Sequence, residues 1–317
     1  MPGLVNFHKA TRTKAKASIL IEGLSGTGKS GLALELANTL ADGDWDKVYA
    51  TDAENRSLSL YSGLQLSDGT TVGEFNVMDL DNSTGYRPTM YKACRDYAIK
   101  DKGIVYIGDS ITHMWQAKDG VLDMVNEAQK NATNKYTVWG LPEIVLEKNT
   151  IMDIIRSPQI HTINTVRVKE KMEIVTGDDG KTALKKLGAL PIMAPEITYE
   201  PDLVIRMEEP GTPDGKAPVG YIEKSRYAIF KVGERYVFNK ELQKQLKAYL
   251  DEGANPEELL EQQRQDYIKG TKLYLDEHPN AKQIWKILKK DLGVENVKLD
   301  DMDLQTLKNL YNRIATD

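Results

Sequence analysis

The amino-acid sequence predicts an α/β fold, in which a mostly parallel, twisted β-sheet is flanked by helices and followed by a small C-terminal helical module. Short apolar runs of strand length alternate with segments of helical periodicity up to about residue 235. A glycine-rich turn joins the first apolar run to a helix, and only helical patterns follow residue 235. Hydrophobic residues at 40% and charged residues at 28% are typical of a globular chain of 317 residues.

Charge and residue usage exclude several classes of protein. A net charge of −5 gives no general attraction to nucleic acid or to an anionic membrane, so such binding would depend on local patches. The single cysteine, Cys94, provides neither an internal disulfide nor a cysteine-cage zinc site, and the four histidines lack metal-ligand spacing. No apolar run approaches the ~18 residues of a membrane span, and the N-terminus lacks the apolar core of a secretion signal. We therefore expect a cytoplasmic protein without a membrane partner.

The sequence predicts three parts of the chain: an N-terminal tail, a core of strands and helices, and a helical module. Residues 1–17 are a basic N-terminal tail that we expect to be loose. The core, 18–235, is expected to contain strands at 18–21, 47–53, 74–80, 103–110, 160–168, 202–209 and 219–232, the last two as antiparallel additions. Its helices are expected at 30–42, 87–101 and through most of 112–156. The helical module, 236–317, has amphipathic, charge-balanced segments that would face a core, or alternatively a partner.

The stretch "GLSGTGKS", residues 23–30, fits the phosphate-binding pattern G-x-x-x-x-G-K-[ST]. It follows a predicted strand and precedes a predicted helix, so its glycines can turn backbone N–H groups inward around a phosphate at the helix N-terminus. Lys29 can then reach the β and γ phosphates, and the Ser30 hydroxyl can ligate Mg²⁺. The alternative is a glycine turn with an incidental lysine. The nucleotide-binding residues that this motif predicts are Gly23, Ser25, Gly26, Thr27, Gly28, Lys29, Ser30 and Gly31.

Two acidic residues after later strands complete the predicted site. Asp109 ends the buried strand "IVYIGD" at the edge where parallel sheets bind ligands, so it is the second candidate ligand for Mg²⁺. Glu54 follows the strand "VYATD" and is the candidate base that orients and activates water beside the γ phosphate. Considered alone, either residue is equally compatible with a structural acid at a strand end.

These motifs, in this order, resemble those of RecA-type recombination ATPases. In that family a D-A-E or D-T-E triplet carries the glutamate that activates water, and "TDAEN" places Glu54 there. A tyrosine that stacks on adenine corresponds to Tyr61, and the γ-phosphate-sensing glutamine of I-N-Q-x-R-x-K corresponds to Thr165 in "INTVRVK". A pair of basic residues that reaches the neighbouring subunit's phosphates corresponds to Lys224 and Arg226 in "EKSR".

The resemblance covers about 18–232 and is closest to the phage-encoded short ATPases associated with single-strand annealing and recombination. It implies a RecA-like P-loop NTPase core that hydrolyses ATP with Mg²⁺, stimulated by DNA, in the cytoplasm of a bacterial host. It also implies a homo-oligomer, ring or filament, whose sites are completed in trans. Single-stranded DNA and a single-strand-binding or other recombination protein would be the further partners.

In that family, two loops facing the oligomer axis bind single-stranded DNA, and here they would be 115–140 and the segment after Arg167. The second segment is locally basic, as tracking of phosphates requires, although a solvated hairpin turning at "GDDG" is the alternative. Its candidate DNA-binding residues are Arg167, Lys169, Lys171, Lys181, Lys185 and Lys186. Trp115, Tyr136 and Trp139 could stack on bases, but such aromatic residues more often pack in a core.

Two functions from other classes remain open at this point. A P-loop phosphotransferase acting on a small molecule would use the same phosphate cradle, but it would need a lid with converging arginines, which the sequence does not suggest. A nucleotide-switched scaffold would bind ATP, hydrolyse little of it and recruit partners through the helical module.

Overall fold

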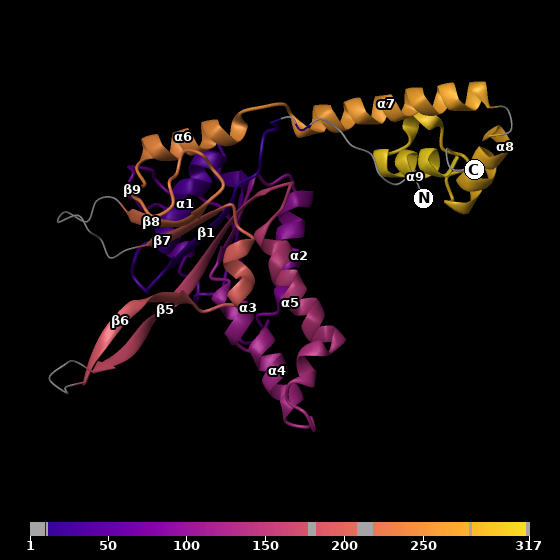
Figure 1. Cartoon of the computed structure of the whole chain (residues 1–317). Helices are drawn as coiled ribbons and strands as arrows, with labels where there is room; N and C mark the ends of the chain where they lie inside the picture. The colour runs from indigo at the N-terminus through magenta and orange to yellow at the C-terminus, as the bar shows by residue number, and fades with distance from the viewer. Residues whose placement is uncertain (1–9, 11, 177–181, 208–217, 279–280, 315–317) are drawn as a thin grey trace. The chain divides into compact units, whose positions relative to one another are not determined.

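The computed structural model describes residues 10, 12–176, 182–207, 218–278 and 281–314. The chain divides into two compact units (Figure 1). One is Ala15–Leu250, and the other comprises the described parts of Met1–Lys14 and Asp251–Asp317. Each unit has a hydrophobic core of its own, so each is described by itself. Among the described residues, no helix combines the length and the apolar character that crossing a membrane would require.

The larger unit is built on a sheet with the order β3-β2-β4-β5-β1-β7-β8-β9, and β6 pairs with β5 outside this path. The strands are β1 Ser18–Gly23, β2 Val48–Asp52, β3 Asn76–Asp79, β4 Val105–Asp109, β5 His161–Thr176, β6 Thr182–Pro191, β7 Leu203–Met207, β8 Val219–Ser225 and β9 Arg235–Val237. The pairs from β3 through to β7 are parallel, whereas β7–β8 and β8–β9 are antiparallel. The predicted α/β class, with a mostly parallel sheet and antiparallel additions after it, is confirmed.

Helices cover both faces of this sheet because side chains of each strand alternate between the two faces. Ile19 and Ile21 of β1 belong to the core cluster that includes α1, whereas Leu20 belongs to the cluster on the other face. The helices of this unit are α1 Lys29–Leu40, α2 Pro88–Lys100, α3 Thr112–Gln116, α4 Val121–Gln129, α5 Pro142–Ile155 and α6 Lys240–Asp251. Side chains of α1 and α6 fill the first cluster, and those of α2 to α5 fill the second.

The position of α6 differs from the predicted division of the chain at 235/236. Leu246 and Leu250 of α6 are buried in the same cluster as α1. The buried Gln243 also accepts a hydrogen bond from Thr39 Oγ1 on α1, at 2.9 Å. The division therefore falls after Leu250, because the apolar face of α6 covers the sheet rather than the later helices.

Strand β5 continues well beyond its expected end at residue 168. Its parallel pairing with β1 reaches Arg167, and from Val168 onward β5 pairs antiparallel with β6. The two strands project from the sheet as a hairpin (Figure 1). The described part of the segment predicted as a DNA-binding loop thus has the antiparallel pairing of the alternative interpretation, a hairpin, and residues 177–181 lie outside the described residues.

The smaller unit contains α7 Pro256–Glu277, α8 Ala281–Asp291 and α9 Leu304–Ile314. Their apolar faces meet in a cluster that includes Ile268, Leu307 and Leu310, so the prediction of core-facing helices is confirmed. The predicted loose tail is wrong for the described residues that adjoin Ser18. Arg12 forms an ion pair with Glu252 at 2.8 Å, the Lys14 N–H bonds the Ala254 carbonyl at 2.9 Å, and Ala17 is buried in the larger unit.

Candidate functional site

The carboxyl ends of four neighbouring parallel strands bring the predicted site residues together. The phosphate-binding stretch follows β1, Glu54 follows β2, Asp109 ends β4, and Thr165 and Arg167 lie on β5. Register explains their proximity, because Asp52 pairs with Asp109, Ile21 with Thr165 and Gly23 with Arg167. This is the edge at which open α/β sheets bind ligands.

The glycines of the stretch 23–30 are required by its backbone. Gly26 and Gly28 have φ of 81° and 84°, values that favour glycine, and α1 begins directly after Gly28. A Cβ on Gly23 would lie 2.6 Å from Thr27 Oγ1 and 3.0 Å from Met207 Cβ, so no larger side chain fits without a shift. The predicted strand, turn and helix are therefore confirmed, and the N-terminus of α1 opens at this turn.

Lys29 is buried at the base of the turn, where its Nζ donates a hydrogen bond to the Leu24 carbonyl at 2.8 Å. Burial lowers the pKa of Lys29, while the nearby charges of Glu54 and Asp109 oppose that shift. The ammonium group thus lies within the electrostatic reach of both acids, as a phosphate-binding lysine in this site requires.

Asp109 is deeply buried, with 1% of its surface exposed. Thr165 Oγ1 donates a short hydrogen bond to Asp109 Oδ1, whereas Oδ2 is buried without a hydrogen-bond partner among the described atoms. Burial raises the pKa of Asp109, and hydrogen bonding by Ser30 and Thr165 counteracts this. An unsatisfied carboxylate oxygen beside the Ser30 hydroxyl fits the predicted Mg²⁺ position. Thr165, predicted as a phosphate sensor, orients the Asp109 carboxylate.

Glu54 lies on a loop that its neighbour Asp52 fixes in place. The buried carboxylate of Asp52 accepts hydrogen bonds from the backbone N–H of Glu54 at 2.7 Å and of Leu58 at 2.8 Å. Asp52 is therefore the structural acid of the pair, and Glu54, which is only partly buried, is the acid that faces the site.

Arg167 contacts Glu54, although the sequence predicts that Arg167 binds DNA and that Glu54 belongs to the nucleotide site. Arg167 Nε donates to Glu54 Oε1 at 2.9 Å, and its backbone N–H donates to Thr112 Oγ1 at 2.9 Å. Burial raises the pKa of Glu54, but hydrogen bonding and the charge of Arg167 together outweigh it, so the pKa of Glu54 is lowered. A signal was present in the sequence, because Thr165 and Arg167 are two residues apart and share one face of a strand.

His113 packs and forms hydrogen bonds near this ion pair. Its Nδ1 lies 3.2 Å from Ser110 Oγ, and its ring lies 5.3 Å from that of Tyr86, centroid to centroid. Burial and the charge of Arg167 lower the pKa of His113, so a neutral imidazole is favoured there.

Tyr61, the predicted adenine contact, lies beside the start of α1. Its Cε1 is 3.9 Å from the point where a Cβ on Gly31 would stand. Burial and the charge of Asp109 raise the pKa of Tyr61.

Lys224 and Arg226 are the cations predicted to reach a neighbouring subunit's phosphates, and both form hydrogen bonds with residues of their own chain. Lys224 Nζ donates to the carbonyls of Thr198, at 3.1 Å, and of Tyr199. Arg226 donates from Nη2 to the same Tyr199 carbonyl at 3.4 Å and from Nη1 to Asp202 Oδ1 at 2.8 Å. The two side chains therefore lie on one side of the sheet edge, as their spacing predicts.

The remaining candidate DNA-binding residues belong to the hairpin. Lys169 is exposed near its root. Lys171, Lys185 and Lys186 lie on the paired backbone of β5 and β6, and Lys181 lies outside the described residues. Of the candidate stacking aromatics, Trp115 is buried against Trp139, with 6.3 Å between their ring centroids, whereas Tyr136 is 87% exposed.

A second Arg–Glu pair, which the sequence analysis missed, lies at the same sheet edge. Glu22, the residue before Gly23, accepts a hydrogen bond from Arg206 Nε at 3.0 Å. Arg206 also pairs with Glu223 at 2.6 Å and donates to the Ala189 carbonyl at 3.3 Å. These residues line a cavity of about 680 Å³ between the hairpin root and β8. Glu22 Oε2 is buried there without a hydrogen-bond partner among the described atoms.

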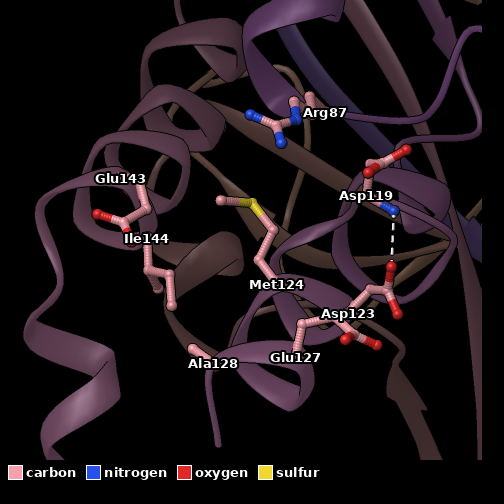
Figure 2. Close-up of a pocket in the computed structure, with 8 residues that line it drawn as sticks. All are labelled: Arg87, Asp119, Asp123, Met124, Glu127, Ala128, Glu143 and Ile144. Carbon is pink, nitrogen blue, oxygen red and sulfur yellow. Dashed lines mark hydrogen bonds between the residues drawn. The ribbon is translucent and has the colours of Figure 1, made fainter. Parts of the chain in front are cut away.

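Another pocket, of about 330 Å³, shares none of the site residues and is mainly acidic (Figure 2). Met124 lies at its centre, with the guanidinium of Arg87 on one side and the side chains of Asp123 and Glu127 on another. The Asp119 backbone N–H donates to Asp123 Oδ2 at 2.9 Å. Because carboxylates outnumber the single arginine, this pocket disfavours phosphate.

Compared with models of known protein families and with curated proteins, the chain gives no match.

Proposed function

We propose that this chain is a RecA-like, Mg²⁺-dependent ATPase that assembles into an oligomer and binds single-stranded DNA in recombination or annealing, as phage-encoded proteins of this kind do. One observation carries the proposal. A phosphate-binding turn, a buried lysine, a buried carboxylate with a free oxygen and a second, accessible carboxylate meet at one sheet edge. No single one of these groups would support ATP hydrolysis by itself.

The turn and Lys29 would hold the triphosphate. Gly26 and Gly28 have the backbone conformations that let successive N–H groups face one anion, at the positive end of the α1 dipole. Lys29 Nζ already donates to a carbonyl of the turn and would exchange that bond for a charge-assisted one to phosphate.

Ser30 and Asp109 would hold Mg²⁺, which when bound supplies positive charge to the phosphates. Among the described residues, no group of three or more His, Cys, Asp or Glu side chains is placed to hold a metal ion. A nucleotide-bound Mg²⁺ usually needs only one or two protein carboxylates, because phosphate and water oxygens complete its shell. The free Oδ2 of Asp109 therefore suffices, with Thr165 holding the carboxylate in place.

Glu54 would take the proton of the attacking water. Its loop is fixed by Asp52, and its carboxylate is ionised at neutral pH because its pKa is lowered. A positioned general base contributes about 10²–10⁴-fold to a reaction rate.

The proposed trans contact uses Lys224 and Arg226, both of which end on the Tyr199 carbonyl within the chain. A neighbouring subunit's phosphate would compete for these cations, since a charged acceptor binds them more strongly than a carbonyl does. The hairpin of β5 and β6, with exposed Lys169 at its root, is the proposed surface for single-stranded DNA.

Binding of ATP is the first test. With Mg²⁺ present, calorimetry should detect ATP binding to the wild type, and Lys29→Ala should weaken it at least tenfold, because the charge-assisted contact is worth about 1.5–3 kcal/mol. Lys100→Ala, at an exposed lysine of α2, is the matched control and should bind normally. Equal binding by all three proteins would exclude this site.

Assembly and DNA binding are tested separately by light scattering with ATP and an oligo-dT strand. We expect a complex larger than one chain, which Lys224→Ala together with Arg226→Ala should diminish. If the chain stays monomeric with both ligands but still hydrolyses ATP, the proposed assembly is wrong and only the ATPase activity remains.

A further inference from the structure

Arg167 occupies one of the two carboxylate oxygens of Glu54, the proposed general base. Its Nε lies 2.9 Å from Glu54 Oε1, a normal charge-assisted hydrogen bond. A base accepts a proton from water only through a free lone pair within about 2.6–3.2 Å. While the ion pair persists, Glu54 is therefore a weaker and less available base than an unpaired carboxylate in the same place.

The other groups that act on Glu54 do not compete with Arg167 in this respect. Ser110 donates a hydrogen bond to it. Lys29, Asp52 and Asp109 act on it through their charges, and so does His113 in its protonated form. Arg167 is the cation that contacts its carboxylate directly, and it is also the most easily removed partner, because 40% of its side chain is exposed.

The position of Arg167 in the fold connects this pair to the hairpin. Arg167 is the last residue of β5 that pairs with β1, and the next residue, Val168, is the first that pairs with β6. Exposed Lys169 lies on the same strand face, two residues further along. A nucleic-acid strand bound along the hairpin root would thus bring phosphates to Lys169 and within reach of Arg167.

We propose that Arg167 restrains Glu54 and that a nucleic-acid phosphate releases this restraint by taking over the guanidinium. Arginine matches phosphate and carboxylate equally well in geometry, so exchange of one for the other loses no hydrogen bond of the guanidinium. Arg167 is then a positioning residue, and the exchange makes ATP hydrolysis depend on bound DNA. This inference rests on the proposed ATPase function.

The test compares steady-state ATP hydrolysis by the wild type, Arg167→Ala and Arg167→Lys, each with and without oligo-dT. Arg167→Ala should hydrolyse ATP faster than the wild type without DNA, by up to roughly tenfold, and oligo-dT should add little further stimulation. Arg167→Lys keeps the charge without the planar fork and should lie between the two. Arg87→Ala is the matched control, since Arg87 faces the acidic pocket of Figure 2 rather than the site, and it should behave as the wild type.

The pH profile of kcat/KM gives a readout that a merely structural role would not move. The rate falls as pH drops through the pKa of Glu54, and loss of Arg167 raises that pKa, because burial then acts with less opposition. The acidic limb should move to higher pH in Arg167→Ala and, likewise, in the wild type when oligo-dT is bound.

The outcomes separate this inference from the proposed function. Slower hydrolysis by Arg167→Ala without DNA, with the wild-type factor of stimulation retained, would overturn the restraint and leave the ATPase intact. No hydrolysis by the wild type under any condition would instead refute the proposed function. Melting temperature and ATP binding, measured for every variant, identify a protein that has merely failed to fold.

Discussion

Two Arg–Glu pairs lie at one edge of the sheet with nearly the same geometry and opposite electrostatic outcomes. Arg167 Nε lies 2.9 Å from Glu54 Oε1, and Arg206 Nε lies 3.0 Å from Glu22 Oε1. The side chain of Glu54 is 25% exposed, whereas that of Glu22 is only 2% exposed. The pKa of Glu54 is lowered, but burial, aided by the charge of Glu223, raises the pKa of Glu22 despite its arginine.

The difference teaches that the distance within an ion pair does not determine its role. Around Glu22 the loss of water outweighs the attraction of the arginine, and removal of Arg206 leaves Glu22 as a buried, unpaired acid. Around Glu54 the hydrogen bonds from Arg167 and Ser110, together with the charges of Arg167 and His113, outweigh the loss of water, and both partners of the ion pair stay partly exposed. Loss of Arg206 from the buried pair therefore destabilises the fold, whereas the accessible pair is the one that the proposed function would exchange.

The largest expected effect separates the two glutamates by activity. Glu54→Gln should lower ATP hydrolysis by about 10²–10⁴-fold while ATP still binds, because the amide cannot accept the proton. Glu22→Gln should hydrolyse ATP within about twofold of the wild type, since Glu22 contacts Arg206 and not the site. The rate of phosphate release from ATP, measured for both variants, tests this difference. Normal hydrolysis by Glu54→Gln would show that another group is the base.

A smaller effect separates the two arginines by stability. Arg206→Ala leaves Glu22 as a buried, unpaired acid, which we expect to cost about 3–5 kcal/mol in the free energy of unfolding. Arg167→Ala breaks an accessible pair and should cost no more than about 1 kcal/mol. Denaturant unfolding measures both. Addition of Glu22→Gln to Arg206→Ala should recover part of the loss, and without any recovery the stabilising role assigned to this pair is wrong.

The smallest expected effect concerns how the free energy of unfolding depends on pH, and it has opposite signs for the two glutamates. The folded-state pKa of Glu54 is depressed, so its contribution to stability is present above the ordinary value of 4.5 and is lost as pH falls through the folded value. The folded-state pKa of Glu22 is raised, so stability is instead lost as pH rises through that value. Relative to the wild type, Glu22→Gln should therefore gain stability as pH rises above 4.5, whereas the stability that Glu54→Gln lacks above pH 4.5 should shrink as pH falls below 4.5. Parallel pH curves for both variants would contradict this assignment.

The sequence predicted those features that depend on local chemistry. Glycines at positive φ, the strand before them and the helix after them are all encoded within 18–42, and the apolar run before Asp109 places that acid at a strand end. Parallel strands end at a common edge, so the meeting of Lys29, Glu54 and Asp109 follows from their order alone.

The features that the sequence did not reveal depend on contacts between distant residues. Arg167 and Glu54 are 113 positions apart, and Arg206 and Glu22 are 184 positions apart, so each contact depends on the strand order of the folded sheet. The prediction that Arg167 binds DNA depends on the family resemblance and on the basic character of its segment, and neither of these encodes a contact with Glu54. The boundary near 235 failed similarly, since an amphipathic helix such as α6 does not encode which apolar surface it covers.

The most direct measurement is a crystal structure with Mg²⁺ and a non-hydrolysable ATP analogue. We predict phosphates within the turn 23–30, with Lys29 Nζ moved from the Leu24 carbonyl to a phosphate oxygen and the metal on Ser30 and Asp109. Binding of the analogue elsewhere, for example in the cavity of Glu22 and Arg206, with Lys29 still on Leu24, would contradict the account.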